Sequence, residues 1–248
     1  MSITNYTEEQ LQKHLHEEHK QSPFSEYIKE IVYGGNDGIV TTFAVVAGFT
    51  GANTGDIATF SFITVLLFGL ANLFADASSM GLGNFLSIRS EQGLYKKSRR
   101  IERRQIKNDP ELEKAQTVYL LKKQGFEEED AKSMTELYAK NPEYWTDFMM
   151  KYELGMAENE ENPFYTGIAT FLSFIVFGFI PLSPYLVISD VTYAFIASCG
   201  GTLLALTLLG IMRWFATKEN IVRAVLEVVL IGGISAVVAF VVGLFFRG

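Results

Sequence analysis

Long stretches without charge alternate with charged stretches along this chain of 248 residues. A helix needs about 20 mostly apolar residues to cross a bilayer. Five stretches long enough for this carry no Asp, Glu, Lys or Arg: residues 38–55, 57–75, 162–189, 191–212 and 228–246. The pattern therefore predicts an all-α membrane protein with five transmembrane helices. The expected spans are residues 31–51, 57–87, 162–184, 191–215 and 221–246.

One long polar region interrupts this pattern between the second and third predicted spans. Its first helix is expected to end near Asn108-Asp109-Pro110, and the second to run from about Glu111 to Gly125. Asn141-Pro142 is expected to begin the last helix. The region is expected to form a cytosolic helical domain, in which the last two helices could also be one bent element. The predicted organisation is a cytosolic tail (1–30), two membrane helices (31–89), the helical domain (90–161) and three further membrane helices (162–248).

Basic residues set the expected orientation, because Lys and Arg concentrate on the cytosolic side of membrane helices. They follow the second predicted span, and they recur between the fourth and the fifth. The turns 50–56 and 185–190 contain none. The tail lacks the apolar core of a signal peptide, so the first span is expected to direct insertion. The prediction is a protein of the cell (inner) membrane with its N-terminus in the cytosol and its C-terminus outside.

Composition narrows the function classes. The net charge of −7 argues against a nucleic-acid partner, and the single Cys199 excludes a disulfide framework and a CxxC metal site. His14, His16 and His19 all lie in the tail, where a solvated segment is the favoured interpretation and metal binding the alternative. Neither a Ser–His arrangement nor an HExxH motif is present, so we expect neither an enzyme nor a prosthetic group.

A polar seam marks the second predicted span. Asn72, Asp76, Met80 and Asn84 recur at steps of four, which places them on one face of a helix. A carboxylate inside a bilayer costs at least about 2.5 kcal/mol and is a functional-site hypothesis by default. Oxygen ligands beside a thioether suggest a borderline transition-metal ion. The alternatives are a structural hydrogen bond for Asp76 and a core position for Met80.

Asp37 is the acid of the first predicted span, towards its cytosolic half. It could ligate a metal ion or carry a proton, because burial raises the pKa of a carboxyl and makes protonation accessible. The alternative is a cap at the start of the helix.

Further acids and methionines lie in the predicted helical domain. Glu102 and Glu113 fall on its first two helices, and Met149, Met150 and Glu153 on its last. If the helices bundle, these side chains could converge on a metal ion. On spacing alone, a solvated acidic face with the methionines in the bundle core is the favoured interpretation.

Longer motifs carry a family resemblance over residues 30–248. They are YGGNDGIVTTFAVVAGFTGA, SSMGLGNFLSIRSE, the acidic helical insert and ENPFYTGIATFLSFIVFGFIPLSPYL. Together they resemble the vacuolar iron transporter family in its bacterial form. The resemblance implies a homodimer with a path between subunits, lined by the first two membrane helices. It also implies that Fe²⁺, often with Mn²⁺, leaves the cytosol in exchange for protons.

The resemblance assigns roles to individual positions. The family's first-helix Asp falls on Asp37 and its second-helix Met on Met80. Its soluble-domain metal ligands fall on five positions: Glu102, Glu113, Met149, Met150 and Glu153. Two departures stand out. Gln105 and Gln116 replace acids that are frequent in the family, which removes charge from the metal site. Many members also have Glu where this chain has Asn72, and a small residue where it has Asp76. We hypothesise that the path acid has moved one turn along the same face, to Asp76.

Two hypotheses follow. The leading one is a dimeric, proton-coupled exporter of Fe²⁺, and also of Mn²⁺ or related divalent ions. The other is a membrane-anchored metal sensor or buffer that binds ions without moving them. The partners expected in both cases are divalent ions, protons, a second subunit and the lipid bilayer.

Overall fold

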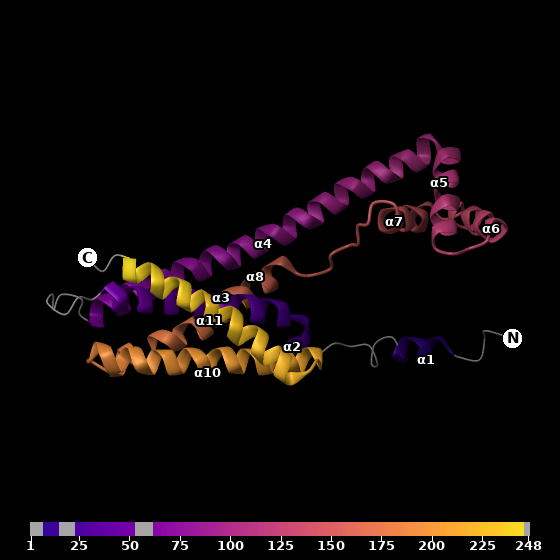
Figure 1. Cartoon of the computed structure of the whole chain (residues 1–248). Helices are drawn as coiled ribbons and strands as arrows, with labels where there is room; N and C mark the ends of the chain where they lie inside the picture. Colours follow the sequence, from indigo (N-terminus) through magenta and orange to yellow (C-terminus); the bar gives the residue numbers. More distant parts are fainter. Residues whose placement is uncertain (1–6, 15–22, 53–61, 246–248) are drawn as a thin grey trace. The chain divides into compact units, whose positions relative to one another are not determined.

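The computed structural model describes residues 7–14, 23–52 and 62–245, and within these ranges the regular elements are all helices (Figure 1). Two short helices, α1 (Glu8–Lys13) and α2 (Pro23–Glu26), precede the long ones. The others are α3 (Ile28–Ala52), α4 (Phe62–Asn108), α5 (Pro110–Lys123), α6 (Glu128–Ala139), α7 (Pro142–Tyr152), α8 (Pro163–Leu182), α9 (Pro184–Val187), α10 (Val191–Thr217) and α11 (Ile221–Phe245). The region 128–154 therefore forms two helices rather than one bent element.

The chain divides into two compact units. The first unit comprises residues 1–84 and 164–248, and the second unit comprises residues 85–163. Helix α4 contributes to both, since its 47 residues run without a break through the unit boundary. At 1.5 Å per residue such a helix is about 70 Å long. The predicted extension of the second span beyond the bilayer is thus continuous with the first helix of the polar region. The predicted start of that span, residues 57–61, lies outside the described residues.

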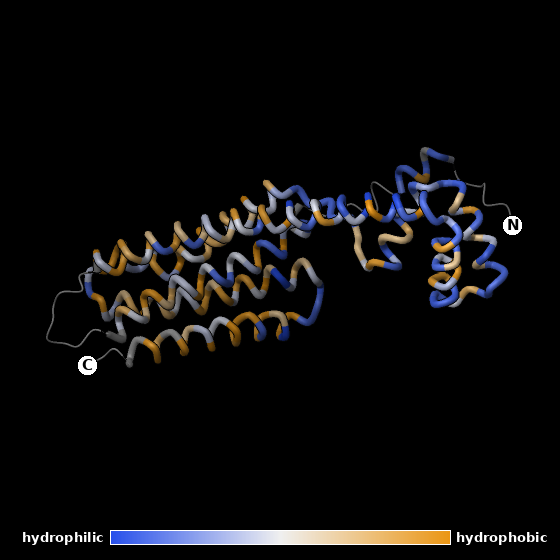
Figure 2. Tube along the Cα trace, turned by 90° about the horizontal axis from the view of Figure 1, so that it is seen from above, coloured by the Kyte–Doolittle hydropathy of each residue, from blue (hydrophilic) through white to orange (hydrophobic). Residues whose placement is uncertain are grey.

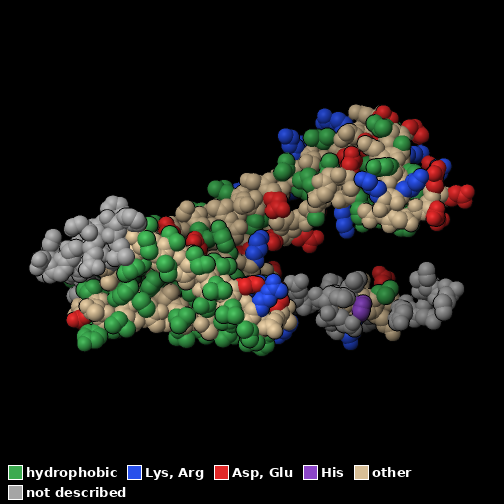
Figure 3. All heavy atoms as spheres, in the orientation of Figure 1, with side chains coloured by type: hydrophobic (Ala, Val, Ile, Leu, Met, Phe, Trp, Pro, Cys, Tyr) green, Lys and Arg blue, Asp and Glu red, His purple; other side chains and the backbone are tan. Residues whose placement is uncertain are grey.

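Four described helices are long and apolar enough to cross a membrane: α4, α8, α10 and α11. Apolar side chains are exposed as well as buried on these helices. Figure 2 shows hydrophobic residues along the helices of the first unit, and Figure 3 shows hydrophobic side chains over its visible face. Val176, Leu204 and Ile234, for example, are 60%, 59% and 64% exposed. Such a surface is stable in lipid rather than in water. Helix α3 has a membrane helix's length, at 25 residues, but Asn36 and Asp37 interrupt its apolar sequence.

Glycine sets the distance between α3 and α8 in the first unit. A Cβ added at Gly38 would collide with the backbone of Phe174, and one at Gly178 would collide with Leu73 and with the carbonyl of Gly38. The two backbones therefore touch where these glycines meet, as is common for membrane helices that pack without large side chains between them. This contact fixes α3 at the residue that directly follows Asp37.

The second unit has its own hydrophobic core, built by α4, α5, α6 and α7 around Trp145. The Trp145 Nε1–H donates to Thr117 Oγ1 at 2.7 Å, so the buried indole is satisfied. Asp109 caps α5 through the backbone N–H of Leu112, and Asn141 caps α7 through that of Tyr144. These caps fix the starts of the two helices.

Replacing Gly38 by Ala tests the α3–α8 contact. The added methyl group has no room, so we expect Gly38→Ala to destabilise the protein by about 1–3 kcal/mol, the range for overpacked cores. Thermal unfolding in detergent, followed by size-exclusion chromatography after heating, measures this. Gly48→Ala in the same helix is the control, because a Cβ there meets nothing within 4 Å. Equal effects of the two substitutions would contradict the close contact.

Candidate metal centre and membrane path

The predicted polar seam of α4 divides into two parts. The Asn72 Nδ2–H donates to Asp76 Oδ2 at 2.7 Å, so one turn of α4 holds the carboxylate by its own amide. Asn84, by contrast, donates through Nδ2 to Thr170 Oγ1 of α8 at 2.8 Å, and Thr170 in turn donates to the carbonyl of Thr166. Asn72 and Asp76 thus form one pair, and Asn84 connects two helices.

Met80 is half-buried and packs against a core cluster that includes Leu73, Ala77 and Phe174. Its side chain therefore lies at the edge of the hydrophobic core, one turn from Asp76. Gly81, its neighbour, faces α8 at close range, since a Cβ there would lie 2.9 Å from the carbonyl of Gly167.

Asp37 lies in the third turn of α3 and is therefore not a helix cap. It borders a pocket of about 460 Å³ that α3 forms with α10 and α11. Asp76 of α4 lies near enough for its charge to act on Asp37. At the same pocket, Arg213 of α10 pairs with Glu227 of α11 at 2.8 Å.

The second unit brings together three of the predicted metal-ligand residues. Glu102 comes from α4, Glu113 from α5 and Glu153 from the C-terminal end of α7. One carboxylate oxygen of each lies within 4.8 Å of the others. Glu102 and Glu113 are each only 2% exposed, whereas Glu153 is exposed. Two buried carboxyls with an exposed third make a site that an ion can enter from solution.

This carboxylate cluster lacks a positive side chain among the described residues. Burial, and then the charges of Glu153 and Glu113, raise the pKa of Glu102 to about 7. Burial also raises the pKa values of Glu113 and Glu153. Glu102 Oε1 and Glu113 Oε2 are buried without a hydrogen-bond partner among the described residues. Because buried charge and unpaired oxygens are both costly, the site favours a bound proton or a cation.

The other predicted ligands lie in different surroundings. Met149 is fully buried in the hydrophobic core of the unit, with its sulfur 3.3 Å from Thr117 Oγ1, and Met150 is fully buried as well. Gln116 Oε1 is buried without a partner among the described residues, one turn after Glu113. Gln105 is exposed. Of the three histidines, His14 is exposed and the other two lie outside the described residues.

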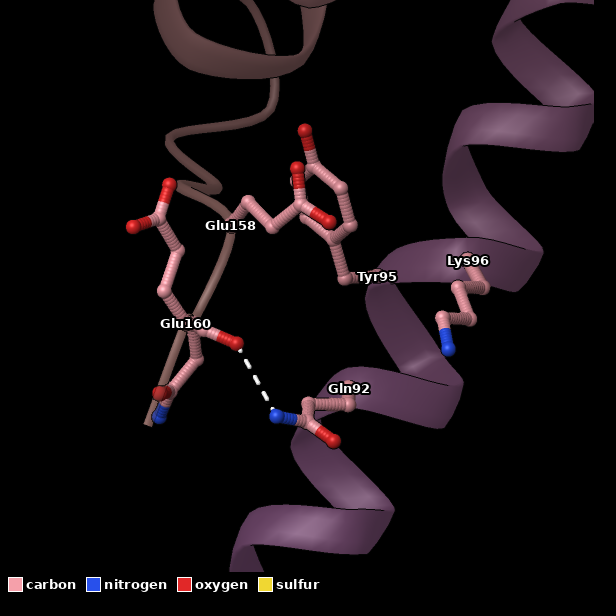
Figure 4. A pocket seen from close by; sticks show the side chains of 6 residues that line it. Gln92, Tyr95, Lys96, Glu158 and Glu160 are labelled. Carbon is pink, nitrogen blue, oxygen red and sulfur yellow. Dashed lines mark hydrogen bonds between the residues drawn. The ribbon is translucent and has the colours of Figure 1, made fainter. Parts of the chain in front are cut away.

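A second group of acids, which the sequence analysis did not single out, lines a pocket of about 220 Å³ beside α4 (Figure 4). Gln92 Nε2 donates to the carbonyls of Asn159 and Glu161, at 3.0 and 2.9 Å, and so ties the segment after α7 to α4. Glu158 and Glu160 flank Asn159 in this segment. Sequence spacing gives no signal for this contact, because its partners are almost 70 positions apart.

Four helices are long and apolar enough to cross a membrane, and the second unit holds a carboxylate cluster that favours a bound cation. These two features indicate an integral membrane protein with a metal-ion function. A sequence model of the VIT family matches residues 28–244. The chain is 33% identical to the vacuolar iron transporter of Centaurea cyanus, over 92% of both chains. It is 32% identical to vacuolar iron transporter 1 of Arabidopsis thaliana, over 96% of this chain and 94% of that one. A vacuolar iron transporter of Plasmodium falciparum is 33% identical, over 87% and 81%.

The chain belongs to the VIT family. The sequence resemblance is thereby confirmed, and so is the prediction that the protein is not an enzyme, since the family consists of metal transporters.

The burial of Glu102 beside two other carboxyls predicts how the stability of the metal-free protein depends on pH. The pKa of Glu102 is about 7 in the folded state against an ordinary value of 4.5, so folding favours its protonated form. Stability should therefore be highest below pH 4.5 and fall as pH rises towards about 7, by at most about 3 kcal/mol from this group. Glu102→Gln removes the loss, so the variant should be more stable than wild type at pH 8 and similar at pH 4.5.

The measurement is thermal unfolding in chelator, followed by the fluorescence of Trp145 in a Trp214→Phe background. Glu111→Gln is the matched control, because the Glu111 carboxylate is 83% exposed on α5. A wild type and a Glu102→Gln variant with the same pH dependence would contradict the prediction.

Proposed function

We propose that the protein is a proton-coupled transporter that moves Fe²⁺, and also Mn²⁺ or a related divalent ion, out of the cytosol. The proposal rests on the carboxylate cluster of Glu102, Glu113 and Glu153. Its carboxylates have no positively charged partner among the described residues, and Glu153 is exposed to solvent. Carboxylate oxygens suit Mn²⁺ and other hard divalent ions, and each relative named above is called an iron transporter. The ion is substrate here, and no prosthetic group is needed.

The cytosolic side of the cluster follows from the positive residues. Arg89, Lys96 and Lys97 follow the apolar part of α4, in the same unit as the cluster, and Lys and Arg in such positions mark the cytosolic side. The cluster would thus collect ions from the cytosol, and transport would run outward. Helix α3 would be the fifth span, with the N-terminus in the cytosol and the C-terminus outside the cell membrane.

The path would pass Asp37, Met80 and Asp76, with Asn72 positioning Asp76 and Asn84 bracing α4 against α8. The charge of Asp76 acts on Asp37. Two like charges that share a low-dielectric site gain from a bound cation or a proton. A metal ion and a proton can therefore occupy the same acids in turn, as the exchange of one for the other requires. A second subunit would complete the path on the open side of α3 and α4.

In the second unit, Glu102, Glu113 and Glu153 would be the primary ligands, and Gln116 would add a neutral oxygen through its unpaired Oε1. Met149 and Met150 would ligate only if they leave their buried positions. Gln105 would need to turn inward from the surface. The fully oxygen-based set therefore has the strongest support.

A metal buffer without transport is the second candidate, favoured by the same cluster taken alone. Flux separates the two. Protein in proteoliposomes should move Mn²⁺ or Fe²⁺ when a pH gradient is imposed, measured with a metal-sensitive dye inside the vesicles. Binding without gradient-dependent flux of any divalent ion would support the buffer and overturn the transporter.

Asp37→Asn should lower the flux at least tenfold, because it removes the charge that a cation or proton needs in the membrane. Asp190→Asn is the control: Asp190 caps α10 through the N–H groups of Thr192 and Tyr193, and Asn can do the same. Both variants should keep wild-type metal binding in the second unit. Unchanged flux in Asp37→Asn would remove Asp37 from the path.

Asp76→Asn tests whether this acid serves where many relatives have one at position 72. It should reduce flux about as strongly as Asp37→Asn, whereas Ser79→Ala on the exposed side of α4 should not. Normal transport by Asp76→Asn would show that the Asn72–Asp76 bond is structural only.

A further inference from the structure

The second unit contains a strongly basic stretch of α4 that metal binding does not explain. Residues 92–107 include seven Lys and Arg and one acid, Glu102, within a chain whose net charge is −7. Cations three and four positions apart face each other on a helix and destabilise it. Such a stretch is stable when anions neutralise part of it. The ion pairs of the second unit identify the acids that neutralise it.

Four of these cations line one cleft of about 220 Å³: Lys96, Arg99, Arg100 and Arg103. The cleft is separate from the carboxylate cluster, whose ligands are not among its lining residues. Its lining is entirely cationic, so its natural occupant is an anion.

Two of the four cations are fixed in place by acids of α7. Arg99 donates through Nε to Asp147 at 2.7 Å and through a terminal nitrogen to Glu143 at 3.0 Å, and Arg103 pairs with Glu143 as well. These bonds use part of each guanidinium and hold it in one orientation. Arg has five donor hydrogens, so further ones remain for a ligand.

Lys96 and Arg100 have no acidic partner among the described residues. In Figure 4 the Lys96 amine points away from the carboxylates of Glu158 and Glu160, although all three line the same neighbouring pocket. The four cations of the cleft therefore face two paired acids, Glu143 and Asp147, and an excess of positive charge remains. Guanidinium groups recognise phosphate oxygens by paired hydrogen bonds, which favours a phosphate ester over a simple halide.

We propose that this cleft binds the phosphate headgroup of an acidic phospholipid from the cytosolic leaflet. Its position supports a lipid source. Arg89 is the first basic residue of α4, and Lys96 follows it by seven residues, or about 10 Å along the helix axis. Basic clusters directly beyond a membrane helix attract acidic headgroups. Binding would neutralise Lys96 and Arg100 and hold this part of α4 at the membrane surface.

The test uses the full-length protein in neutral detergent, titrated with phosphatidic acid and observed by native mass spectrometry. Lys96→Gln with Arg100→Gln removes the two unpaired cations of the cleft. Each basic residue near an acidic surface strengthens binding about fivefold, so the double variant should bind about thirtyfold more weakly. Lys97→Gln with Arg104→Gln is the matched control, because it removes the same charge from the same helix outside the cleft.

The site is supported if the cleft variant loses affinity for phosphatidic acid while the affinity of the control variant stays within about threefold of wild type. Equal losses in both variants would show a diffuse attraction and overturn it. A second arm adds inorganic phosphate: millimolar phosphate that displaces the lipid completely would point to a soluble ligand and overturn the lipid assignment. Phosphatidylcholine should bind wild type and cleft variant alike. Metal binding at Glu102 should be unchanged throughout, so this result and the transport result are independent.

Discussion

Backbone hydrogen bonding along the unbroken helix α4 is the constraint on which the rest of the structure depends. Each turn of this helix fixes the orientation of the next turn. The directions in which side chains point are therefore set continuously over all 47 residues, from the apolar region to the polar one. The Asn72–Asp76 pair, the basic cleft and Glu102 all lie on this one element. A break in it would place Glu102 and Asp76 on independent elements.

Acidic side chains lie near one another in both units. Glu102 and Glu113 are buried together without an ion-pair partner among the described residues, and in the first unit the charge of Asp76 acts on Asp37. The buried carboxyls of the second unit would be more stable with a proton or a cation bound. Close packing is present in both units: Trp145 and its neighbours form the core of the second, and Gly38 and Gly178 bring two backbones into contact in the first.

Much of this could be predicted from the sequence. Charge-free stretches predicted the membrane helices, and α4, α8, α10 and α11 confirm four of them. Pro142 predicted the start of α7, because a proline at the first helical position loses no helical hydrogen bond. Helix α5 begins at Pro110, one residue before the expected start at Glu111. The motifs around Asp37 and Met80 identified the family. The steps of four from Asn72 to Asn84 correctly placed these residues on one helix, but they gave no sign that Asn84 bonds to Thr170.

The sequence by itself determined the membrane class, the helix order, the family and the residue types available for metal chemistry, because hydrophobicity and helix signals act over short distances along the chain. Only the tertiary structure decided which acids meet. Glu102, Glu113 and Glu153 come from three helices, and their convergence depends on how those helices pack. The same packing buried Met149 in the core, as the interpretation from spacing alone favoured, and left Gln105 exposed, although the family resemblance placed both at the metal site. Position along the chain cannot distinguish them. It determines the direction in which a side chain leaves its helix, but only the packing of neighbouring helices determines what the side chain meets.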